Sequence, residues 1–538
     1  MIDSGDTAWV LACTALVLFM TPGLAFFYAG MVRVRNVLSM MMVNFVPLGI
    51  VTVLWLLLGY SIAFGNDAGG GLFGDFSLFG MQNLDSAPAP ALHVISPGVA
   101  IPLLAFVAYQ MMFAVITPAL VTGATADRLR VGGWAVFVGI WSLIVYAPIA
   151  HWVFSPQGWL AGGGTQDWAG GLVVHASAGA AAIAVLLVVG RRKDWPNAAN
   201  RPNSVPLVLI GAGILWFGWF GFNAGDGLAA DGIAAQALLN TASAAAAGML
   251  AWLLVERYTE GRPTVLGAVT GAVAGLATIT PCAGYVGVMI ATAIGFVAGI
   301  VCHFALKAKF VFRYDDALDV IAVHFVGGVL GTFLLGFVGQ KSVNPIGRDG
   351  LFFGGGLRLL GWQLLGIAAV VAFSFVLSWL IAVAVDRTIG LRTRPEDEDN
   401  LDAVQESSAA YALDVVASGQ KRGSLNGATP APALPAVADG RLSLVTALVE
   451  APDPVELRRA LTGAGALSIV LSQASLYTGE VRTEVVRGHH IEVDFHDRLR
   501  VEVTAAAADV PRVAAALDTF ADGAGAARVV TLATVPQA

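Results

Sequence analysis

Two histidines lie inside long apolar stretches of the chain, and each follows an aspartate by eight residues. His175 follows Asp167 in DWAGGLVVH, and His324 follows Asp316 in DALDVIAVH. A titratable side chain in the hydrocarbon of a membrane is costly and usually marks a path for ions or protons. Because the two motifs match and fall in different halves of the apolar region, they predict a duplicated fold with paired pore residues. The alternative is two core histidines that bond to neighbouring backbone.

The composition is that of a membrane protein with a more polar C-terminal part. Of the 538 residues, 57% are hydrophobic and 12% are charged, whereas soluble domains have about 25% charged residues. The 63 glycines suit close packing of helices in lipid. The three cysteines are widely spaced and predict neither a disulfide framework nor a metal site. The sequence shows no nucleophile–base pair or phosphate-binding loop, so we expect no enzyme, and we expect no nucleic acid among the partners.

Eleven apolar stretches have about the length that crosses a bilayer as a helix, roughly 18 to 25 residues. They are 7–32, 40–65, 97–122, 131–155, 169–190, 206–222, 232–256, 263–280, 284–306, 317–340 and 357–386. Lysine and arginine are concentrated in the loops on one side, and the other side has only Lys341, Arg348 and Arg358. Positive residues favour cytoplasmic loops. We therefore expect the chain in the cell (inner) membrane, with its N-terminus outside and its C-terminal part in the cytoplasm.

The expected fold class is an α-helical polytopic membrane protein, with eleven transmembrane helices in an inverted repeat and a C-terminal α+β domain. The transmembrane domain covers 1–386, a cytoplasmic regulatory tail 387–411, and a linker rich in alanine and proline 412–440. In 441–538 the pattern alternates as strand, helix, two strands, helix and strand. This βαββαβ order is typical of ferredoxin-like domains.

Residues 1–411 resemble the ammonium transporter (Amt) family along their whole length. The motifs that carry the resemblance are GLAFFYAGMVRVRNVLSMMM, YQMMFAVITPALVTGATADR, DWAGGLVVH, WFGWFGFNAG, ALDVIAVH and GLR, in this order. The resemblance implies a homotrimer in the lipid bilayer, with one narrow apolar pore for ammonium or ammonia in each subunit.

The resemblance also implies roles for individual pore residues. The matching residues are His175 and His324 for the family's twin histidines, Phe113 and Phe222 for two stacked rings that close the outer end, Trp219 for a tryptophan below this gate, and Asp167 for an aspartate near the outer vestibule. Tyr109 lies one helical turn before Phe113, so we expect it to line the vestibule too.

The chemistry of these residues agrees with that assignment. Ammonium is nearly the size of water or potassium, so size cannot select it. A dry pore imposes a large desolvation cost on any ion; potassium cannot avoid this cost, but ammonium can by giving up its proton. Neutral ammonia then needs hydrogen-bond partners, and a neutral imidazole offers both a donor and an acceptor. In the family the net event is taken to be electrogenic, with ammonia and a proton travelling separately.

The outer recruitment site departs from the family pattern at two positions. Phe154 in HWVFS stands where the family usually has a tryptophan, and Asp226 in FNAGD stands where it usually has a serine. Phenylalanine keeps a weaker cation–π face and loses the indole N–H donor. An ionised aspartate would hold a cation more strongly at the mouth. The alternative is that Asp226 caps the start of the next helix.

The C-terminal domain resembles the PII signalling proteins in SLVTALVEAPDPVELRRAL, TEVVRGHHIEVDF and the closing strand. PII proteins are trimers that cap the cytoplasmic face of Amt trimers, and Arg487 in VVRGHH matches the long-loop arginine that they insert into the pore exit. The family's nucleotide-binding stretches are poorly matched here. Three alternatives stay open: a divergent domain that binds a nucleotide or another anionic ligand, a permanent plug or cap, and a trimer-stabilising module without a ligand.

The leading hypothesis is an ammonium transporter that is regulated by its own PII-like domain. One alternative is an ammonium sensor, in which Asp226 traps the ion and the C-terminal domain reports occupancy. Another is a passive gas or water channel without charge movement. The twin histidines and the stacked rings favour transport, whereas Asp226, Phe154 and the fused domain favour sensing.

Overall fold

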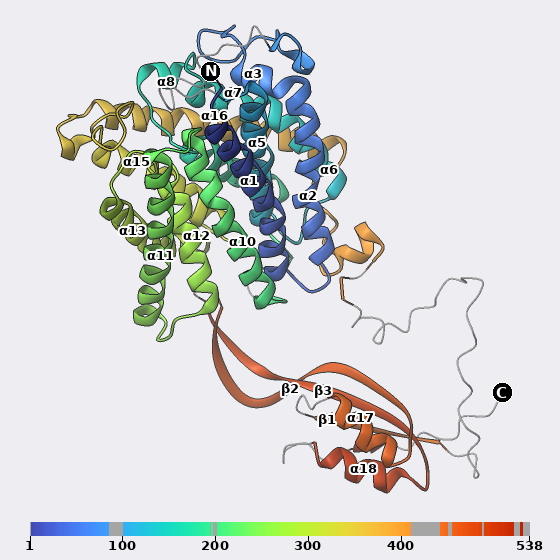
Figure 1. Ribbon diagram of the computed structural model, residues 1–538. Coiled ribbons are helices and arrows are strands. Elements are labelled where there is room, and N and C mark those ends of the chain that lie inside the picture. Colours follow the sequence, from blue (N-terminus) through green and yellow to red (C-terminus); the bar gives the residue numbers. More distant parts are fainter. Residues whose placement is uncertain are drawn as a thin grey trace. The chain divides into compact units, whose positions relative to one another are not determined.

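The computed structural model describes residues 2–84, 101–193, 195–196, 202–408, 410–411, 442–449, 454–486, 489–520 and 528–530. The chain forms two compact units, Met1–Ala410 and Tyr411–Ala538. The first unit is helical and the second contains a small sheet (Figure 1). The expected linker, 412–440, lies outside the described residues.

The first unit is a bundle of apolar helices. Its α-helices are α1 (Ser4–Met31), α2 (Val37–Leu54), α3 (Tyr60–Phe64), α5 (Leu103–Ala124), α6 (Val131–Trp141), α7 (Ala147–Phe154), α8 (Trp159–Gly163), α9 (Ser177–Val189), α10 (Val205–Ala224), α11 (Gly232–Thr259), α12 (Val265–Ile279), α13 (Val288–Leu306), α14 (Ala308–Val311), α15 (Val326–Val338) and α16 (Arg358–Thr388). Within the described ranges, ten helical segments are long and apolar enough to cross a membrane. The remaining expected span, 263–280, contains α12, which has 15 residues.

Tighter or wider helical turns continue several of these helices. The π-helical turns are η1 (Trp55–Gly59), η4 (Ser142–Tyr146), η5 (Gly171–Ala176), η7 (Ile321–Phe325) and η9 (Asp402–Glu406), and the 3-10 turns are η2 (Phe79–Met81), η6 (Gly225–Gly227) and η8 (Leu351–Phe353). π-Helical turns are rare and frequently lie at functional sites. Two of them, η5 and η7, contain His175 and His324.

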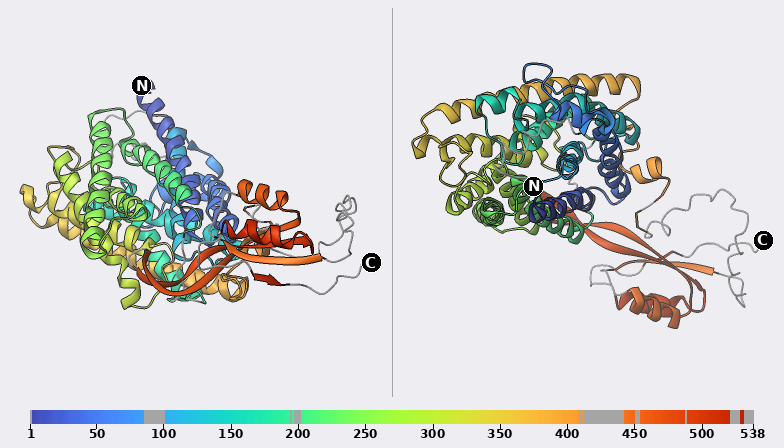
Figure 2. Two further views of the ribbon diagram at one scale, coloured as in Figure 1. Left: turned by 90° about the horizontal axis from the view of Figure 1, so that it is seen from below. Right: turned by 45° about the horizontal axis from the view of Figure 1, so that its top comes forward.

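The helices approach each other closely where small residues meet. Helix α1 packs along α10, and α11 packs against both α12 and α13, as Figures 1 and 2 show. A methyl group added to Gly248 of α11 would lie 2.6 Å from the carbonyl oxygen of Gly271 in α12. Large apolar side chains such as Leu250 and Met289 are exposed on the outside. Small residues at helix contacts and apolar residues outside are the arrangement expected in lipid.

The segment that follows α16 folds back onto the ends of other helices in the same unit. The Asp402 carboxylate accepts hydrogen bonds from the backbone N–H groups of Leu38 (3.1 Å) and Ser39 (2.9 Å), and so caps the start of α2. The Gln405 side chain accepts a bond from the Val131 N–H at 2.8 Å, at the start of α6. The expected tail is therefore anchored to the helical bundle through these two residues.

A buried cluster of charges holds the loops at this end together. Arg128 lies 2.5 Å from Asp315, and Arg192 lies 2.7 Å from the same carboxylate. Arg192 also reaches Asp127 at 3.3 Å. Burial alone would raise the pKa of Asp315, but hydrogen bonds from Arg192 and the charge of Arg128 outweigh it and lower the pKa to about 2. Because Asp315 directly precedes Asp316, the cluster fixes the start of the segment that leads to His324.

The second unit is a four-stranded antiparallel sheet with two helices. Its elements are β1 (Leu442–Val449), α17 (Pro454–Gly463), β2 (Ala466–Val486), β3 (His489–Ala506), α18 (Val510–Asp518) and β4 (Arg528–Val530), and the strand order is β2-β3-β1-β4. Alternate residues such as Val445 and Val503 form the core with Leu457 of α17 and Leu517 of α18. Both helices therefore cover one face of the sheet (Figure 1).

Strands β2 and β3 continue beyond the sheet core as a two-stranded ribbon. The stretch ALSIVLSQASLY predicts a second strand that ends at Tyr477, but β2 runs to Val486. Val486 pairs with His489, and a register shift separates the pairs of Tyr477 and Arg482. The expectation of a shorter strand was wrong, because the turn residues at 478–480 form this irregularity within the ladder and do not end the strand.

Candidate functional site

The two histidines singled out in the sequence meet in the centre of the first unit. Their Nδ1 atoms are 3.2 Å apart, and their rings are nearly parallel, with an interplanar angle of 18°. Both side chains are buried. One Nδ1 atom must donate the shared hydrogen and the other must accept it, so a neutral pair contains two different tautomers. The Nε2 atom of His175 has no hydrogen-bond partner in the described ranges.

Each histidine is held by the aspartate that precedes it by eight residues. The Asp167 carboxylate accepts hydrogen bonds from four backbone N–H groups, those of Gly170, Gly171, Leu172 and Val173, at 2.6 to 3.1 Å. The Asp316 carboxylate accepts two such bonds, from Val320 and Ile321. Each aspartate thus caps the π-helical turn that presents a histidine. This shared geometry explains the common spacing in the sequence.

Aromatic rings close one side of the histidine pair. The rings of Phe113 and Phe222 are 4.4 Å apart between centroids and tilted by 39° to each other, and this ring pair is named the Phe113–Phe222 stack. The Trp219 ring lies nearly parallel to His175 at 5.5 Å, and its indole N–H donates to Thr280 at 2.9 Å. Phe222 lies 6.1 Å from His175 on the same side. The structure therefore brings all of the expected pore residues together in one row of rings.

The histidines line a narrow cavity with about 20 Å³ of space for water-sized molecules. Its other walls are apolar and include Trp219, Phe222 and aliphatic side chains such as Leu215. A cavity needs about 10–15 Å³ of such space to hold one water molecule. The space beside the histidines therefore fits a single small molecule, and the histidine nitrogens are its polar partners.

The residues expected at the outer mouth differ in whether they contact the Phe113 and Phe222 rings. Tyr109 lies edge-on to Phe113, with centroids 5.0 Å apart, and its hydroxyl donates toward the carbonyl oxygens of Gly221 and Phe222, each at 2.9 Å. Tyr109 therefore positions the Phe222 ring. Phe154 ends α7 and is buried, but among the described residues no ring contact joins it to Phe113 or Phe222.

Asp226 lies in η6, just after α10, and its side chain is fully buried. Within the part of the chain that the structure describes, neither carboxylate oxygen has a hydrogen-bond donor. The following helix, α11, is capped by Asp231, which accepts bonds from the N–H groups of Ile233 and Ala234. The alternative that Asp226 caps this helix is therefore wrong, because the cap lies five residues further along the chain.

Sequence reasoning missed three neighbours of these residues. The Thr280 hydroxyl accepts a hydrogen bond from Trp219. The amide of Gln110 and the hydroxyl of Tyr146 are buried and complete no hydrogen bond with the residues that the structure describes. Gln110 directly follows Tyr109 in the YQMMF motif, so its place beside the vestibule could have been inferred. Thr280 and Tyr146 carry no comparable signal, because only the packing of separate helices brings them to the site.

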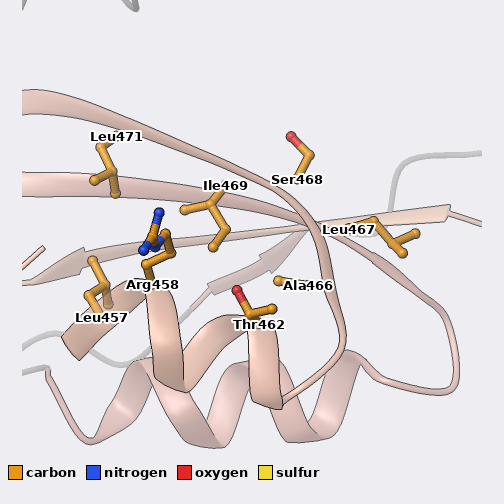
Figure 3. Close-up of a pocket in the computed structure, with 8 residues that line it drawn as sticks. All are labelled: Leu457, Arg458, Thr462, Ala466, Leu467, Ser468, Ile469 and Leu471. Carbon is orange, nitrogen blue, oxygen red and sulfur yellow. The ribbon is translucent and has the colours of Figure 1, made fainter. Parts of the chain in front are cut away.

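In the second unit, Arg487 lies outside the described residues, between the paired residues Val486 and His489. An open groove of about 600 Å³ runs between α17 and β2. Figure 3 shows Arg458 and Thr462 rising from α17 toward Ile469 and Leu471 of β2. Arg458 is the only charged side chain among the residues that line the groove in the described part of this unit. A groove with one cationic side chain and mostly apolar walls is poorly suited to bind the phosphates of a nucleotide.

Comparison with known proteins matches most of the chain to ammonium transporters. The family model described as the Ammonium Transporter Family matches residues 8–411. An ammonium transporter of Mycobacterium tuberculosis strain H37Rv is 44% identical over 439 residues, which cover 78% of this chain and 92% of that protein. Ammonium transporter Amt1 of Archaeoglobus fulgidus is 42% identical over 411 residues, covering 76% of this chain and all of that protein.

Solved structures agree in fold. The crystal structure of Candida albicans Mep2 has a TM-score of 0.68 and 34% identity, covering 74% of this chain and 88% of that one. A structure described as a sensor Amt protein has a TM-score of 0.67 and 30% identity, covering 74% and 98%. The relatives are ammonium transporters and not enzymes, as expected for this chain. The resemblance of the helical part to ammonium transporters is confirmed, and the chain belongs to the ammonium transporter family.

Proposed function

We propose that this protein carries ammonium across the cell membrane through an apolar pore in which His175 and His324 are the polar groups. The observation that carries the proposal is the buried histidine pair, with Nδ1 atoms 3.2 Å apart, beside a cavity that fits one small molecule. A paired imidazole can donate to ammonia or accept from it, and it can share a proton with its neighbour. No chemical reaction on the substrate other than proton transfer is needed.

Selectivity follows from the surroundings of the pair. The Phe113–Phe222 stack and the aliphatic walls supply no ligand that could replace the water shell of potassium. Moving an ion into such a space costs several kcal/mol or more. Ammonium lowers this cost by leaving its proton behind, since neutral ammonia needs only the hydrogen bonds that the histidines offer. The pore therefore selects a molecule that can lose its charge.

The outer residues divide into two roles. Tyr109, Phe154 and Asp226 recruit the cation, with Asp226 supplying negative charge and the rings supplying cation–π attraction of about 0.5–2 kcal/mol. Asp167, whose carboxylate is occupied by four backbone amides, positions His175 and adds negative potential. Direct contact between Asp167 and a cation is disfavoured because its lone pairs are already used.

The assembly proposed for the membrane is a homotrimer of eleven-span subunits built from an inverted repeat. The matched turns η5 and η7, each capped by an aspartate and each presenting a histidine, support an internal duplication. The concentration of lysine and arginine in one set of loops supports an outside N-terminus and a cytoplasmic C-terminal unit.

The second unit is proposed to be a ferredoxin-like, PII-like regulatory domain. Its element order is strand, helix, strand, strand, helix, strand, and its strand order is β2-β3-β1-β4, which supports this assignment. The ribbon from Tyr477 to Val486 extends about 30 Å at about 3.3 Å per residue. In the sequence, Arg487 directly follows Val486, the last described residue of β2. A positive charge that follows such a long ribbon in the chain suits contact with a channel.

If the domain restrains transport through this arginine, Arg487→Ala raises the ammonium flux several-fold. The reason is that the shortened side chain can no longer enter a narrow exit or pair with its carbonyl and carboxylate groups. The measurement is ammonium-evoked current in proteoliposomes. Arg482→Ala, on the same ribbon but before its turn, serves as the control and should leave the flux unchanged. Unchanged flux in Arg487→Ala would exclude the alternative in which the C-terminal domain plugs the pore through this arginine.

Transport itself is tested by comparing the full chain with a form truncated after Tyr411, at the start of the second unit. The expected result is an ammonium-evoked current in both, larger in the truncated form because its restraint is gone. Potassium in place of ammonium gives no current in either. Ammonium binding without current in both forms would show instead that the membrane unit senses the ion and does not carry it.

A further inference from the structure

The buried carboxylate of Asp226 can act as a base as well as attract a cation. Asp226 lies four residues after Phe222, at the end of α10 where the indole N–H of Trp9 donates to the Ala224 carbonyl at 3.3 Å. The Phe222 ring contacts both Phe113 and His175, with centroid distances of 4.4 Å and 6.1 Å. The carboxylate of Asp226 therefore follows closely in the chain on a ring that joins the aromatic pair to the histidines.

The surroundings of Asp226 contain no cationic partner. Among the described residues it makes no ion pair, and the charged group that acts on it is the carboxylate of Asp167. Gln110 lies close enough to interact, but neither its amide nor the Asp226 carboxylate completes a hydrogen bond. The titratable groups packed around Asp226 are Cys13, Tyr109, Tyr146, Asp167 and Tyr285. None of them carries a positive charge.

A buried, unpartnered carboxylate is stable only with a bound cation or a proton. The two acidic residues of this mouth differ in this respect. Asp167 accepts four amide hydrogens, which use its lone pairs and make it a poor base. Asp226 accepts no hydrogen bond from the described residues. Its lone pairs are free to bind an ammonium hydrogen and then to take it.

We propose that Asp226 accepts the proton that ammonium loses before ammonia passes the Phe113–Phe222 stack. One N–H bond of ammonium breaks and one O–H bond of the carboxyl forms, while the electron pair of the broken bond stays on nitrogen. An ion pair becomes neutral ammonia and a neutral carboxylic acid, so both can remain in an apolar site. The carboxyl then gives its proton to a water molecule, which restores the carboxylate for the next cycle, and the proton crosses separately from ammonia, so that a current still accompanies transport.

The proposal rests on the proposed transport function and adds a second basis of selection to it. Potassium can pair with Asp226, but it has no proton to transfer and stays an ion at the entrance. Ammonium pairs with the same carboxylate and loses its charge there. Asp226 therefore acts on the rate of passage as well as on binding, which separates it from a residue that only attracts cations.

The test uses the full chain in proteoliposomes and the variants Asp226→Asn, Asp226→Ser and Asp226→Glu. Asp226→Asn keeps the shape of the side chain but not the base, so transport at saturating ammonium should fall about 100-fold and lose its dependence on pH between 5 and 8. Asp226→Glu should restore part of the rate. Asp231→Asn, which alters only an exposed cap at the same mouth, should behave as the unsubstituted protein.

Asp226→Ser provides the same comparison if the asparagine variant does not fold, since a small hydroxyl also lacks a strong base. A raised KM with an unchanged maximal rate in both variants overturns the proposal, because Asp226 would then only attract the cation. An unchanged pH profile in both variants overturns it too. Failure of the proposed function looks different: the unsubstituted protein would carry no ammonium.

Discussion

We expect His175→Ala to abolish ammonium-selective current. The substitution removes the ring that shares a hydrogen with His324 and stacks on Trp219. Ammonia in the cavity then loses a polar partner, and a lost hydrogen bond in a buried site costs about 1–3 kcal/mol, or about 5- to 150-fold in rate. The vacated space also admits water, which lowers the barrier against potassium. Ammonium and potassium currents measured in the same proteoliposomes report both effects.

The control for this variant is a substitution of another buried histidine that does not belong to the His175–His324 pair. His303 is buried in α13, edge-on to Trp252 at 5.1 Å. His303→Gln should keep ammonium current and selectivity. Wild-type selectivity in His175→Ala would contradict the proposal and favour the bland alternative, in which the histidines are satisfied core residues.

The second large effect is expected on stability. Asp315→Ala leaves the fully buried Arg128 without its partner, and breaking a buried pair on one side costs about 3–5 kcal/mol. The melting temperature of the purified protein in detergent measures this loss. Asp399→Ala is the matched control: its carboxylate pairs with Arg33 and Lys193 but is 53% exposed, so its removal should cost less than about 1 kcal/mol.

The buried pair of Asp315 and Arg128 also predicts how the stability of the protein depends on pH. The folded-state pKa of Asp315 is lowered from 3.8 to about 2. A depressed carboxyl pKa contributes stability that is fully present above pH of about 4 and is lost as pH falls toward 2. The shift corresponds to about 2 kcal/mol. Asp315→Ala should therefore show a flatter fall in melting temperature than the unsubstituted protein between pH 4 and pH 2, and equal slopes would contradict this account.

Much of the candidate site could be predicted from residue types and spacing. An apolar run of about 20 residues must form a helix in lipid, because backbone polar groups have no other partner there. A histidine within such a run is conspicuous for the same reason. The sequence was therefore sufficient to single out His175 and His324, to place the helical spans, and to assign the resemblance to ammonium transporters that the comparisons confirm for 8–411.

The finer roles depended on contacts between distant parts of the chain. Asp167 was expected near the recruitment site, and only the structure shows its carboxylate bound by four amides of the next turn. The composition of 387–411 did not indicate that Asp402 would cap α2, more than 360 residues away. The cap of α11 fell to Asp231 and not to Asp226 because the 3-10 turn η6 comes between α10 and α11.

The sequence by itself determined which segments are helical and apolar, and which few polar side chains lie among them, because burial in lipid restricts both choices. Only the tertiary structure decided which of those side chains have partners. Asp167 and Asp315 have several, whereas the Asp226 carboxylate finds no hydrogen-bond donor among the described residues. The physical reason is that a hydrogen bond requires a donor within about 3 Å, and that distance is set by how separate helices pack and not by the order of residues along the chain.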